Sequence, residues 1–461
     1  MTLIKSISGI RGTIGGKPGE GLSPLDVVKF SAAYGTWLQK RNNAKKLSVV
    51  VGRDARLSGD IVNHLVVSTL RSLGINVVDL GLSTTPTVEV AVDMEKAHGG
   101  IILTASHNPK EWNALKLLNE KGEFISAKDG AEVLELAEKD SFEFIDVDNL
   151  GKLIKNDTYT SKHIEAVLKL PYVDVEAIKK ADFTIVVDAV NSTGGIVVPE
   201  LLTALGVNKI EKIHCEPTGY FAHNPEPLPA HLTDLSSAIK ESNADLGITV
   251  DPDVDRLAMV CEDSSMFGEE YTLVAVADYV LSQKGGATVS NLSSTRALRD
   301  VTEKHGHKYY ASAVGEVNVV EKMKAVNAII GGEGNGGVIL PELHYGRDAL
   351  VGIAIFLTHL AKSGKKASEL RDSYPAYTIS KNKIQLTPQI DVDKVLVNME
   401  EKYKNMEVDN TDGVKIYFEK EWVHLRKSNT EPIIRIYSES ENEEKANELA
   451  EKIINEIEAI I

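Results

Sequence analysis

The sequence contains only two cysteines, Cys215 and Cys261, among 461 residues. Two thiols exclude a disulfide framework and a four-thiolate zinc site, so we expect a reducing compartment, the cytoplasm. The chain also lacks any run of about 18 apolar residues, and its first residues, MTLIKSISGIRG, lack the apolar stretch of a signal peptide. We therefore expect no membrane span and no membrane partner.

The chain also has fewer basic residues than acidic ones. The chain carries 51 Lys and Arg against 67 Asp and Glu, which gives a formal net charge of −16 at pH 7. A surface this acidic repels nucleic acid unless basic groups cluster locally, so no nucleic-acid partner is expected. Hydrophobic residues make up 43 % of the chain, as in ordinary globular proteins. The length exceeds what one core can use and predicts three or four domains.

Short apolar runs that end abruptly in Gly, Asp, Ser or Asn recur along the chain. They lie at residues 47–56, 99–109, 183–195, 245–256 and 328–337. Such runs are typical of buried strands that open into loops. Amphipathic stretches with helical spacing lie between them, at 58–74, 195–206 and 298–306. This alternation predicts mostly parallel sheets that are covered by helices and joined by right-handed crossovers.

The strand-like runs pair by thirds of the chain, each third having an early strand and a later one with a polar loop. We therefore expect three related mixed-sheet α/β domains, at residues 1–153, 154–256 and 257–370. The last part differs, because residues 421–440 have the pattern strand, turn, strand and an amphipathic helix follows. Residues 371–461 are expected to form a smaller α+β domain.

A segment rich in aspartate, Asp251-Pro252-Asp253-Val254-Asp255-Arg256, follows the apolar run LGITV. Alternate residues of an extended loop can face the same way, so the three aspartates could converge on a hard cation, for which Mg²⁺ is the natural candidate. Without a cation, three adjacent carboxylates would repel and raise one another's pKa. An acidic, solvated turn is the alternative. An EF-hand is excluded, because its loop Gly and distal Glu are missing.

The segment TASHNP at 104–109 follows another apolar run and contains Ser106 and His107. A serine at such a strand end is expected to be exposed on a loop, where sheet enzymes place reacting groups. Serine before Asn-Pro is also a common turn signal, and most such serines bond only to backbone. His107 is ambiguous, because adjacent side chains at a strand end point in opposite directions.

Two further loops carry groups suited to sugar phosphates. The segment GGEGNGG at 331–337 lacks the Lys-Ser/Thr of a P-loop and has Glu333 at its centre, which favours sugar hydroxyls over phosphate; a mobile turn is the alternative. The segment RKSNTEP at 426–432, with Arg435 on the next strand, offers a guanidinium, hydroxyls, an amide and backbone N–H groups. These donors suit a phosphate dianion.

These four loops, in this order, resemble the α-D-phosphohexomutase superfamily, which includes phosphoglucomutases, phosphomannomutases and phosphoglucosamine mutases. The resemblance covers essentially the whole chain. It is carried by TASHNP, DPDVDR and RKSNTEP and supported by SGIRG at 8–12 and GRD at 52–54. It implies four domains around one central cleft, which contribute in chain order a phosphoserine loop, a metal loop, a sugar-binding loop and a phosphate-binding loop.

The resemblance also implies roles for individual residues. The implied catalytic residues are the phosphoserine Ser106 together with Arg11, His107, Lys116 and Arg256. Lys116 and Arg11 are candidates for proton transfer or charge stabilisation, and His107 for orienting the serine loop. The implied ligands of Mg²⁺ are Ser106, Asp251, Asp253 and Asp255. The implied substrate-binding residues are Glu333 and Asn335 for the sugar, and Arg426, Ser428, Asn429, Thr430 and Arg435 for the distal phosphate.

The implied activity is the interconversion of hexose 6-phosphate and hexose 1-phosphate through a hexose 1,6-bisphosphate, which also acts as activator. In many bacterial members the sugar loop ends in Ser-Gly-His, whereas here Asn and Gly stand at the corresponding positions of GEGNGG. Together with SGIRGTIGG, this form resembles the phosphoglucosamine mutase and archaeal-type branch. Glucosamine phosphate is therefore favoured over glucose or mannose phosphate.

Two other classes of protein fit parts of the pattern. A Mg²⁺-dependent phosphomonoesterase would use the same serine and aspartates with water as acceptor, but it needs no second phosphate grip at 426–430. A sugar-phosphate-binding protein without chemistry predicts no phosphate on Ser106. In each case a small phosphosugar is the expected partner, and a monomer or homodimer the expected assembly.

Overall fold

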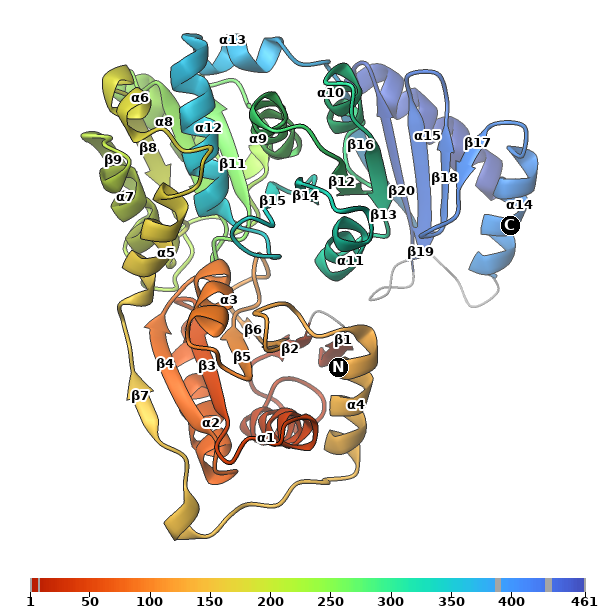
Figure 1. Ribbon diagram of the computed structural model, residues 1–461. Coiled ribbons are helices and arrows are strands. Elements are labelled where there is room, and N and C mark those ends of the chain that lie inside the picture. Colours follow the sequence, from red (N-terminus) through yellow and green to blue (C-terminus); the bar gives the residue numbers. More distant parts are fainter. Residues whose placement is uncertain (1, 7–8, 386–390, 428–432, 460–461) are drawn as a thin grey trace. The chain divides into compact units, whose positions relative to one another are not determined.

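The computed structural model describes residues 2–6, 9–385, 391–427 and 433–459. These residues form four sheets with helices packed against them (Figure 1). The chain divides into two compact units, neither of which is continuous in sequence. Unit 1 comprises residues 1–272 and 336–368, and unit 2 comprises residues 273–335 and 369–461.

The first sheet lies in unit 1, and its strand order is β1-β2-β6-β5-β3-β4-β7. Its strands are β1 (Ile4–Ser6), β2 (Gly9–Thr13), β3 (Ser48–Arg53), β4 (Asn76–Leu82), β5 (Gly99–Leu103), β6 (Trp112–Leu118) and β7 (Leu153–Lys155). Strand β3 pairs in parallel with β4 and β5, whereas β6 runs antiparallel to β2 and β5. The sheet is therefore mixed.

Helices cover both faces of this sheet. They are α1 (Pro24–Arg41), α2 (Gly59–Ser72), α3 (Thr85–Met94) and α4 (Ala127–Glu138). Alternate residues of β3 enter different cores: Val49 and Val51 pack with residues of α1 and α2, whereas Val50 packs with residues of α3. Because successive side chains of a strand point to opposite faces, a strand buried on both sides needs an unbroken apolar run. The run SVVVG in β3 meets that need.

The second sheet has the order β11-β10-β8-β9 and also lies in unit 1. Its strands are β8 (Thr184–Asp188), β9 (Lys209–Ile213), β10 (Leu246–Val250) and β11 (Leu257–Cys261). The helical segments nearby in sequence are η1 (Val147–Asn149), α5 (Tyr159–Leu168), α6 (Val175–Ala181), α7 (Gly194–Ala204), η2 (Pro229–His231) and α8 (Thr233–Ser242). Strand β8 pairs in parallel with β9 and β10, whereas β10 and β11 form an antiparallel hairpin.

Unit 1 also includes a segment from later in the chain, with β15 (Gly337–Ile339) and α12 (Ala349–Ser363). Most of α12 is buried, and the helix contacts α5, α6 and α7. A helix that is apolar nearly all round is a core helix, so this segment is part of the hydrophobic interior of unit 1.

Unit 2 contains three strands that pair in parallel and an antiparallel sheet. Up to residue 372, the elements that lie wholly or mostly in unit 2 are α9 (Glu269–Gln283), β12 (Thr288–Asn291), α10 (Ala297–Lys304), β13 (Tyr309–Ser312), α11 (Glu316–Val326), β14 (Ile330–Glu333) and α13 (Ala367–Asp372). Strand β12 pairs in parallel with β13 and β14. The last sheet has the order β16-β20-β19-β18-β17, and its neighbouring strands are antiparallel.

The strands of this last sheet are β16 (Thr378–Gln385), β17 (Glu407–Asp409), β18 (Val414–Tyr417), β19 (Trp422–Lys427) and β20 (Ile433–Ser440). Helices α14 (Val392–Lys402) and α15 (Glu443–Glu458) share one hydrophobic core with the apolar side chains of β18, β19 and β20. The two predicted strands and the predicted terminal helix are therefore confirmed, as β19, β20 and α15.

The expected strands and helices are present, and the first two sheets are mixed, as expected. The apolar runs contain β3, β5, β8, β10 and β14, and the amphipathic stretches contain α2, α7 and α10. The first two sheets are less parallel than the strand–helix rhythm predicts. The reason is visible at β10 and β11, because the residues between them, 251–256, are too few for a crossover and allow only a hairpin. The predicted domain boundaries near 153, 256 and 370 stay predictions.

None of the described helices is both long enough and apolar enough to cross a membrane.

Candidate active site

Ser106 lies in the turn that follows β5. Its backbone has a φ of +49°, a conformation that residues other than glycine rarely adopt, and its amide donates to Thr104 Oγ1 at 2.9 Å. The prediction that this serine is exposed is wrong, because only 8 % of its surface is accessible. The turn also ends the strand alternation, so Ser106 Oγ lies 3.4 Å from His107 Nδ1 and the two side chains do not point apart.

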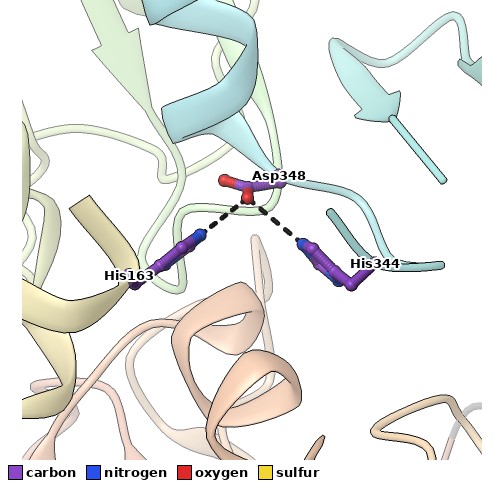
Figure 2. A group of neighbouring side chains, drawn as sticks. All are labelled: His163, His344 and Asp348. Carbon is purple, nitrogen blue, oxygen red and sulfur yellow. Dashed lines mark hydrogen bonds and ion pairs between the residues drawn. The ribbon is translucent and has the colours of Figure 1, made fainter. Parts of the chain in front are cut away.

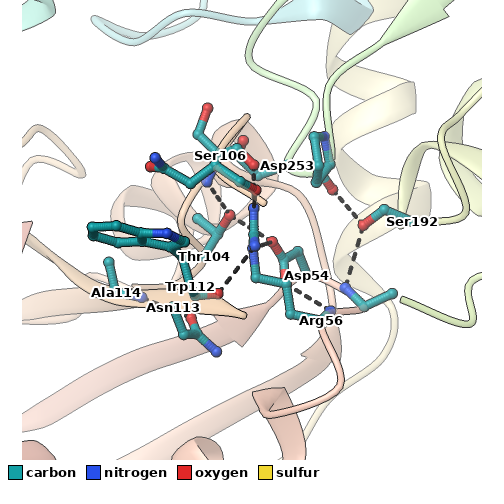
Figure 3. A network of polar contacts seen from close by, with 12 residues as sticks. Asp54, Arg56, Thr104, Ser106, Trp112, Asn113, Ala114, Ser192 and Asp253 are labelled. Carbon is teal, nitrogen blue, oxygen red and sulfur yellow. Dashed lines mark hydrogen bonds and ion pairs between the residues drawn. The ribbon is translucent and has the colours of Figure 1, made fainter. Parts of the chain in front are cut away.

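Arg56 holds the serine turn in place (Figure 3). The side chain is 1 % exposed, and its planar guanidinium presents its N–H donors in a fixed fork geometry. It donates to the carbonyl oxygens of Ser106 (2.5 Å), Asn108 (2.6 Å), Pro109 (2.6 Å) and Trp112 (3.0 Å), and to Asp54 Oδ2 (3.0 Å). One fully buried arginine therefore fixes the path of the whole serine turn.

The three aspartates of the β10–β11 hairpin converge. Their side chains are fully buried, and one carboxylate oxygen from each lies within 4.8 Å of the others. The sequence predicted that they would converge through an extended loop, and this prediction is wrong. A turn with Val254 at a φ of +63° reverses the chain between Asp253 and Asp255. That conformation is a genuine outlier for a β-branched residue.

The serine turn and the aspartate turn meet directly. Ser106 Oγ donates to Asp251 Oδ2 at 2.7 Å, and the other oxygen of Asp251 accepts from the amides of Asp255 and Arg256. Burial, with Asp253 and Asp255 close by, raises the pKa of Asp251 well above its ordinary value. The residues that the sequence pointed to most strongly are therefore in contact.

Ser192 forms a second bridge between the two turns (Figure 3). Its hydroxyl accepts from the amide of Ala55 at 3.3 Å and donates to the carbonyl of Pro252 at 2.7 Å. Because Ala55 lies beside Arg56, this hydroxyl ties the segment that holds the serine turn to the aspartate turn.

Three cationic or hydroxyl groups bind the aspartates. Lys116 Nζ lies 2.7 Å from Asp253 Oδ2 and 3.5 Å from Asp255 Oδ2. Burial lowers the pKa of Lys116, but the two carboxylates outweigh it and raise that pKa above its ordinary value. Thr85 Oγ1 donates to Asp253 at 2.5 Å, and the Arg347 guanidinium donates to Asp255 at 2.6 Å. Lys116 is consequently a buried, protonated cation.

Arg11, His107 and Arg256 interact electrostatically with one another. Burial and the neighbouring Arg256 lower the pKa of Arg11, which lies on β2. The same two causes hold the pKa of His107 far below its ordinary value, so its imidazole is neutral at pH 7. Arg256 itself is 9 % exposed, with Nε 3.9 Å from Asp255 Oδ1. An anion bound near these groups would relieve the repulsion between them.

Glu333 and Asn335, the residues predicted to bind the sugar, lie in unit 2. Glu333 ends β14 and is 4 % exposed, and its Oε1 accepts from Asn291 Nδ2 at 2.8 Å and from the amide of Gly315 at 3.1 Å. Asn335 Nδ2 lies 3.5 Å from Glu333 Oε2. The glycine-rich loop therefore has a fixed carboxylate at its centre, as the sequence suggested.

Arg426 and Arg435, also in unit 2, are directly opposite each other on β19 and β20. Lys383 of β16 is opposite Arg435 in turn, so three cations form a row across three strands. Like charges in directly opposed positions are destabilising, and such a row is suited to an anion. The sequence had given no sign of Lys383. Ser428, Asn429 and Thr430 lie outside the residues that the structure describes.

Four family models together match most of the chain. They describe phosphoglucomutase/phosphomannomutase α/β/α domains I, II and III and the C-terminal domain, and they match residues 3–144, 161–265, 268–377 and 388–456. The chain belongs to this family. The predicted superfamily and the predicted four-domain α/β fold are thus confirmed.

Named members of the phosphoglucomutase/phosphomannomutase family match nearly the full chain. A phosphoglucomutase/phosphomannomutase of Thermococcus kodakarensis is 39 % identical over 95 % of this chain and 96 % of its own. A phosphoglucosamine/phosphogalactosamine mutase of Sulfurisphaera tokodaii is 33 % identical over 98 % of both chains. The crystal structure of a family protein from Burkholderia thailandensis, 24 % identical, has the same fold, with a TM-score of 0.83 over 99 % of this chain and 98 % of its own.

The donor set of this family member fits a hard divalent cation. Asp253 Oδ1 and Asp255 Oδ1 are buried but have no hydrogen-bond partner among the residues that the structure describes. A buried carboxylate oxygen without a partner is costly, and a cation would satisfy both oxygens. All candidate ligands are oxygens, which Mg²⁺ prefers over nitrogen or sulfur. Asp251, Asp253, Asp255 and Ser106 could therefore hold it together.

Sequence reasoning missed three residues that this family member places at the site: Arg56, Thr85 and Arg347. Arg56 follows the GRD motif by two residues, and Arg347 lies in a second copy of the tetrapeptide GRDA, at 346–349. That repeat was the available signal, because its first copy stands at the end of the buried strand β3, where polar motifs often enter a site. Thr85 gave no signal, since it is one of several threonines at the start of a helix.

Proposed function

We propose that this protein is a phosphohexomutase that interconverts hexose 6-phosphate and hexose 1-phosphate through a phosphorylated Ser106. The observation that carries the proposal is the contact of 2.7 Å between Ser106 Oγ and Asp251 Oδ2, in a buried cluster that also contains Lys116. A hydroxyl nucleophile, a set of carboxylates for a cation, and fixed positive charge are the parts that phosphoryl transfer requires. Membership of the phosphoglucomutase/phosphomannomutase family supports it.

Phosphorylated Ser106 would transfer its phosphoryl group to the free hydroxyl of the sugar phosphate. The bond between phosphorus and the serine oxygen breaks and the bond to the sugar oxygen forms. The sugar hydroxyl loses its proton, the serine oxygen takes one up, and a hexose 1,6-bisphosphate results. Its other phosphate then returns a phosphoryl group to Ser106. Because the serine turn is fixed by Arg56, the serine oxygen keeps one position in both half-reactions.

Charge on the transferring phosphoryl group needs neutralisation from this chain. Lys116 is held protonated by Asp253 and Asp255, so it is suited to donate a proton or to stabilise negative charge, and not to accept a proton. Arg11 and Arg256 supply further positive charge, and neutral His107 orients the serine hydroxyl. Asp251, Asp253 and Asp255 would hold Mg²⁺, which when bound neutralises charge on the phosphoryl oxygens.

In unit 2, we assign Arg426 and Arg435 to the phosphate that does not react, together with Ser428, Asn429 and Thr430. The row of cations on β16, β20 and β19 supports this assignment. Glu333 and Asn335 are assigned to sugar hydroxyls. The fixed carboxylate of Glu333 can accept hydrogen bonds from hydroxyls and from an amino group alike.

For the sugar, we propose glucosamine phosphate. The GEGNGG form of the sugar loop supports it, as does the similarity to a phosphoglucosamine/phosphogalactosamine mutase. Glucose and mannose phosphates are the second candidates, because the relative from Thermococcus kodakarensis is a phosphoglucomutase/phosphomannomutase. Turnover of glucosamine 6-phosphate, glucose 1-phosphate and mannose 1-phosphate distinguishes the two. A tenfold preference for either neutral sugar, on the order of 1.4 kcal/mol, would overturn the glucosamine assignment.

Replacement of the nucleophile tests the mechanism. Ser106→Ala is expected to lower kcat by at least about 10³-fold while substrate still binds, since the hydroxyl that carries the phosphoryl group is gone. Intact mass should show one phosphate gained by the wild type, but not by Ser106→Ala, after incubation with a hexose 1,6-bisphosphate. Ser72→Ala, at a half-buried position on α2, is the matched control and should behave as wild type.

Three outcomes would contradict the proposal. Wild-type turnover in Ser106→Ala would remove the nucleophile assignment. Stoichiometric release of free phosphate from a hexose phosphate would favour a phosphomonoesterase, and a lack of phosphate transfer to the wild type would favour a binding protein. Chelation with EDTA should abolish turnover and added Mg²⁺ should restore it, as expected for an oxygen-only cation site.

A further inference from the structure

A second group of side chains converges in unit 1 and includes none of the residues assigned to phosphoryl transfer. His163 of α5, His344 of the loop before α12, and Asp348 at the N-terminus of α12 point toward one another (Figure 2). His163 Nε2 lies 2.9 Å and His344 Nε2 lies 3.2 Å from the same oxygen, Asp348 Oδ2. One donor atom from each residue lies within 4.8 Å of the others.

All three side chains are withdrawn from solvent. His163 and Asp348 are 0 % and 1 % exposed at the side chain, and His344 is 9 % exposed. Asp348 is also fixed by the backbone, because its Oδ1 caps α12 by accepting from the amides of Leu350 and Val351. That cap uses one oxygen and leaves Oδ2 aimed at the histidines.

The other ring nitrogen of each histidine faces helix α3, through a hydrogen bond for His163 and through an ion-pair contact for His344. His163 Nδ1 lies 3.0 Å from Thr87 Oγ1, and His344 Nδ1 lies 3.2 Å from Glu89 Oε2. Metal-ligating histidines commonly bond a hydroxyl, carbonyl or carboxylate in this way, which fixes the ring and increases its basicity. The two Nε2 atoms are thus held in position by partners that are not ligands.

The charges at this site call for a cation. Glu89 and Asp348 are both buried, 1 % exposed each; Asp348 contacts both histidines and Glu89 contacts His344. Negative charge on two buried carboxylates is costly to leave uncompensated away from water. Positive charge is therefore stabilised here, and it can be supplied by a proton on His344 or by a metal ion.

We propose that His163, His344 and Asp348 bind a divalent transition-metal ion, for which Zn²⁺ is the best match. Two imidazole nitrogens and one carboxylate form a donor set that suits Zn²⁺ and its neighbours, and not the oxygen-seeking Mg²⁺. The metal would join α5 to the segment before α12, and the residues of α3 that contact the two histidines would hold the rings in place. The site would thus connect three parts of unit 1 that are far apart in sequence.

This metal site would also support the aspartate turn. Helix α3 carries Thr85, which donates to Asp253, and Arg347, next to Asp348, donates to Asp255. A metal that fixes α3 and the start of α12 therefore fixes two of the groups that hold the aspartates. The ion itself takes no part in the reaction.

Metal content tests the proposal without reference to turnover. Full-length protein is stripped with a chelator and titrated with Zn²⁺ or Co²⁺ in excess Mg²⁺, which occupies the oxygen-only site. One equivalent of Zn²⁺ should bind per chain, and Co²⁺ should give the visible absorption of a site with nitrogen ligands. His163→Gln and His344→Gln should each lose this equivalent, whereas Asp253→Asn should keep it.

Two further variants guard against misfolding and against chance. Glu89→Gln keeps every ligand but weakens the anchor of His344, so it should lower Zn²⁺ affinity by about 10–100-fold. His305→Gln removes a histidine that pairs with Asp278 at 2.7 Å, and should bind Zn²⁺ as wild type does. No stoichiometric Zn²⁺ in the wild type, with His344 seen as an imidazolium by ¹⁵N NMR, would overturn the proposal. Binding that survives in both ligand variants would overturn it as well.

Discussion

The serine turn shows how a single side chain can fix the path of a loop. Arg56 lies two residues after Asp54, outside the turn, yet it donates to four of the turn's carbonyl oxygens. Carbonyl oxygens in a buried turn need donors, and a guanidinium supplies several in a fixed plane. Arg56 is thus a positioning residue, and it donates to the carbonyl of Ser106, whose backbone is left-handed.

Arg56→Lys tests this role. Lysine keeps the charge beside Asp54 but lacks the fork, so the serine turn should relax and kcat should fall by about 100-fold, the usual effect of a displacement of about 1 Å. The rate at which a hexose 1,6-bisphosphate phosphorylates Ser106 should fall in parallel, while KM changes little.

The matched control for Arg56→Lys is Arg53→Lys. Arg53 is the neighbouring arginine at the end of β3, and it donates to the carbonyl of Asp54 without reaching the serine turn. Equal losses of phosphorylation rate in both variants would show that the effect is not specific to the contacts of Arg56 with the serine turn.

At the scale of the element, strand register brings together residues that have no relation in sequence. In the last sheet, Ile384, Ile434 and Leu425 face the core with α14 and α15. Alternation therefore puts Lys383, Arg435 and Arg426 on the opposite face, and the register lines them up. The row follows from the pairing of β16 with β20, since nothing near Lys383 in the sequence marks it.

Lys383→Gln should weaken substrate binding. Removal of one exposed cation from the row should raise KM for the hexose phosphate several-fold, with kcat nearly unchanged, because an exposed charge pair contributes up to about 1 kcal/mol. The effect should shrink at high salt. Lys381→Gln, two residues along the same strand and outside the row, is the control, and an equal rise in KM there would contradict the role of the row.

The same sheet contains a buried carboxyl that links it to helix α10. Glu439 Oε1 accepts from the amide of Arg296 and from Trp422 Nε1, and the residue is fully buried. Burial raises the pKa of Glu439 to about 7, although its hydrogen bonds and Lys415 oppose that shift. In the folded protein it therefore holds its proton at a pH where the unfolded chain has released it.

Stability of unit 2 should consequently fall as pH rises. A carboxyl with a raised folded pKa contributes fully below its unfolded value of 4.5, and the contribution is lost as pH rises through about 7. The loss from this group is at most about 3 kcal/mol. Glu439→Gln keeps the acceptor but removes the titration, so urea unfolding at pH 5.5 and pH 8 should show a smaller pH dependence than wild type. Identical pH dependence in the two proteins would contradict this account.

At the scale of the whole molecule, the compact units cut across the order of the chain. Residues 336–368 belong to unit 1, although the residues on both sides of this segment belong to unit 2. Helix α12 fills the interior beside α5, α6 and α7, and Arg347 binds Asp255. The first 272 residues therefore lack part of their own core.

A fragment of residues 1–272 should not fold cooperatively. Without α12, the apolar surface on α5, α6 and α7 is exposed, and the fragment should bind a hydrophobic dye and be cleaved rapidly by proteases. Addition of residues 336–368 through a flexible linker should restore a cooperative urea transition. A sharp transition in the fragment alone would contradict the division into units.

Much of the fold and of the candidate site could be predicted from local sequence patterns. Apolar runs that end in polar turns predicted β3, β5, β8, β10 and β14, because a strand buried on two faces requires such a run. The same runs pointed to Ser106 and the three aspartates, since reactive groups stand where buried strands end. The order of the four loops was sufficient to indicate the family.

Contacts between distant segments were decided only by the tertiary structure. Arg56 at the serine turn, Arg347 at Asp255, Lys383 beside Arg435, and His163 beside Asp348 all depend on which strands pair and where helices pack. Residue spacing carries no information about such contacts, because the chain that separates the partners can take many paths. The conformations of Ser106 and Val254 are likewise imposed by the surrounding contacts, since their own intrinsic preference is against them.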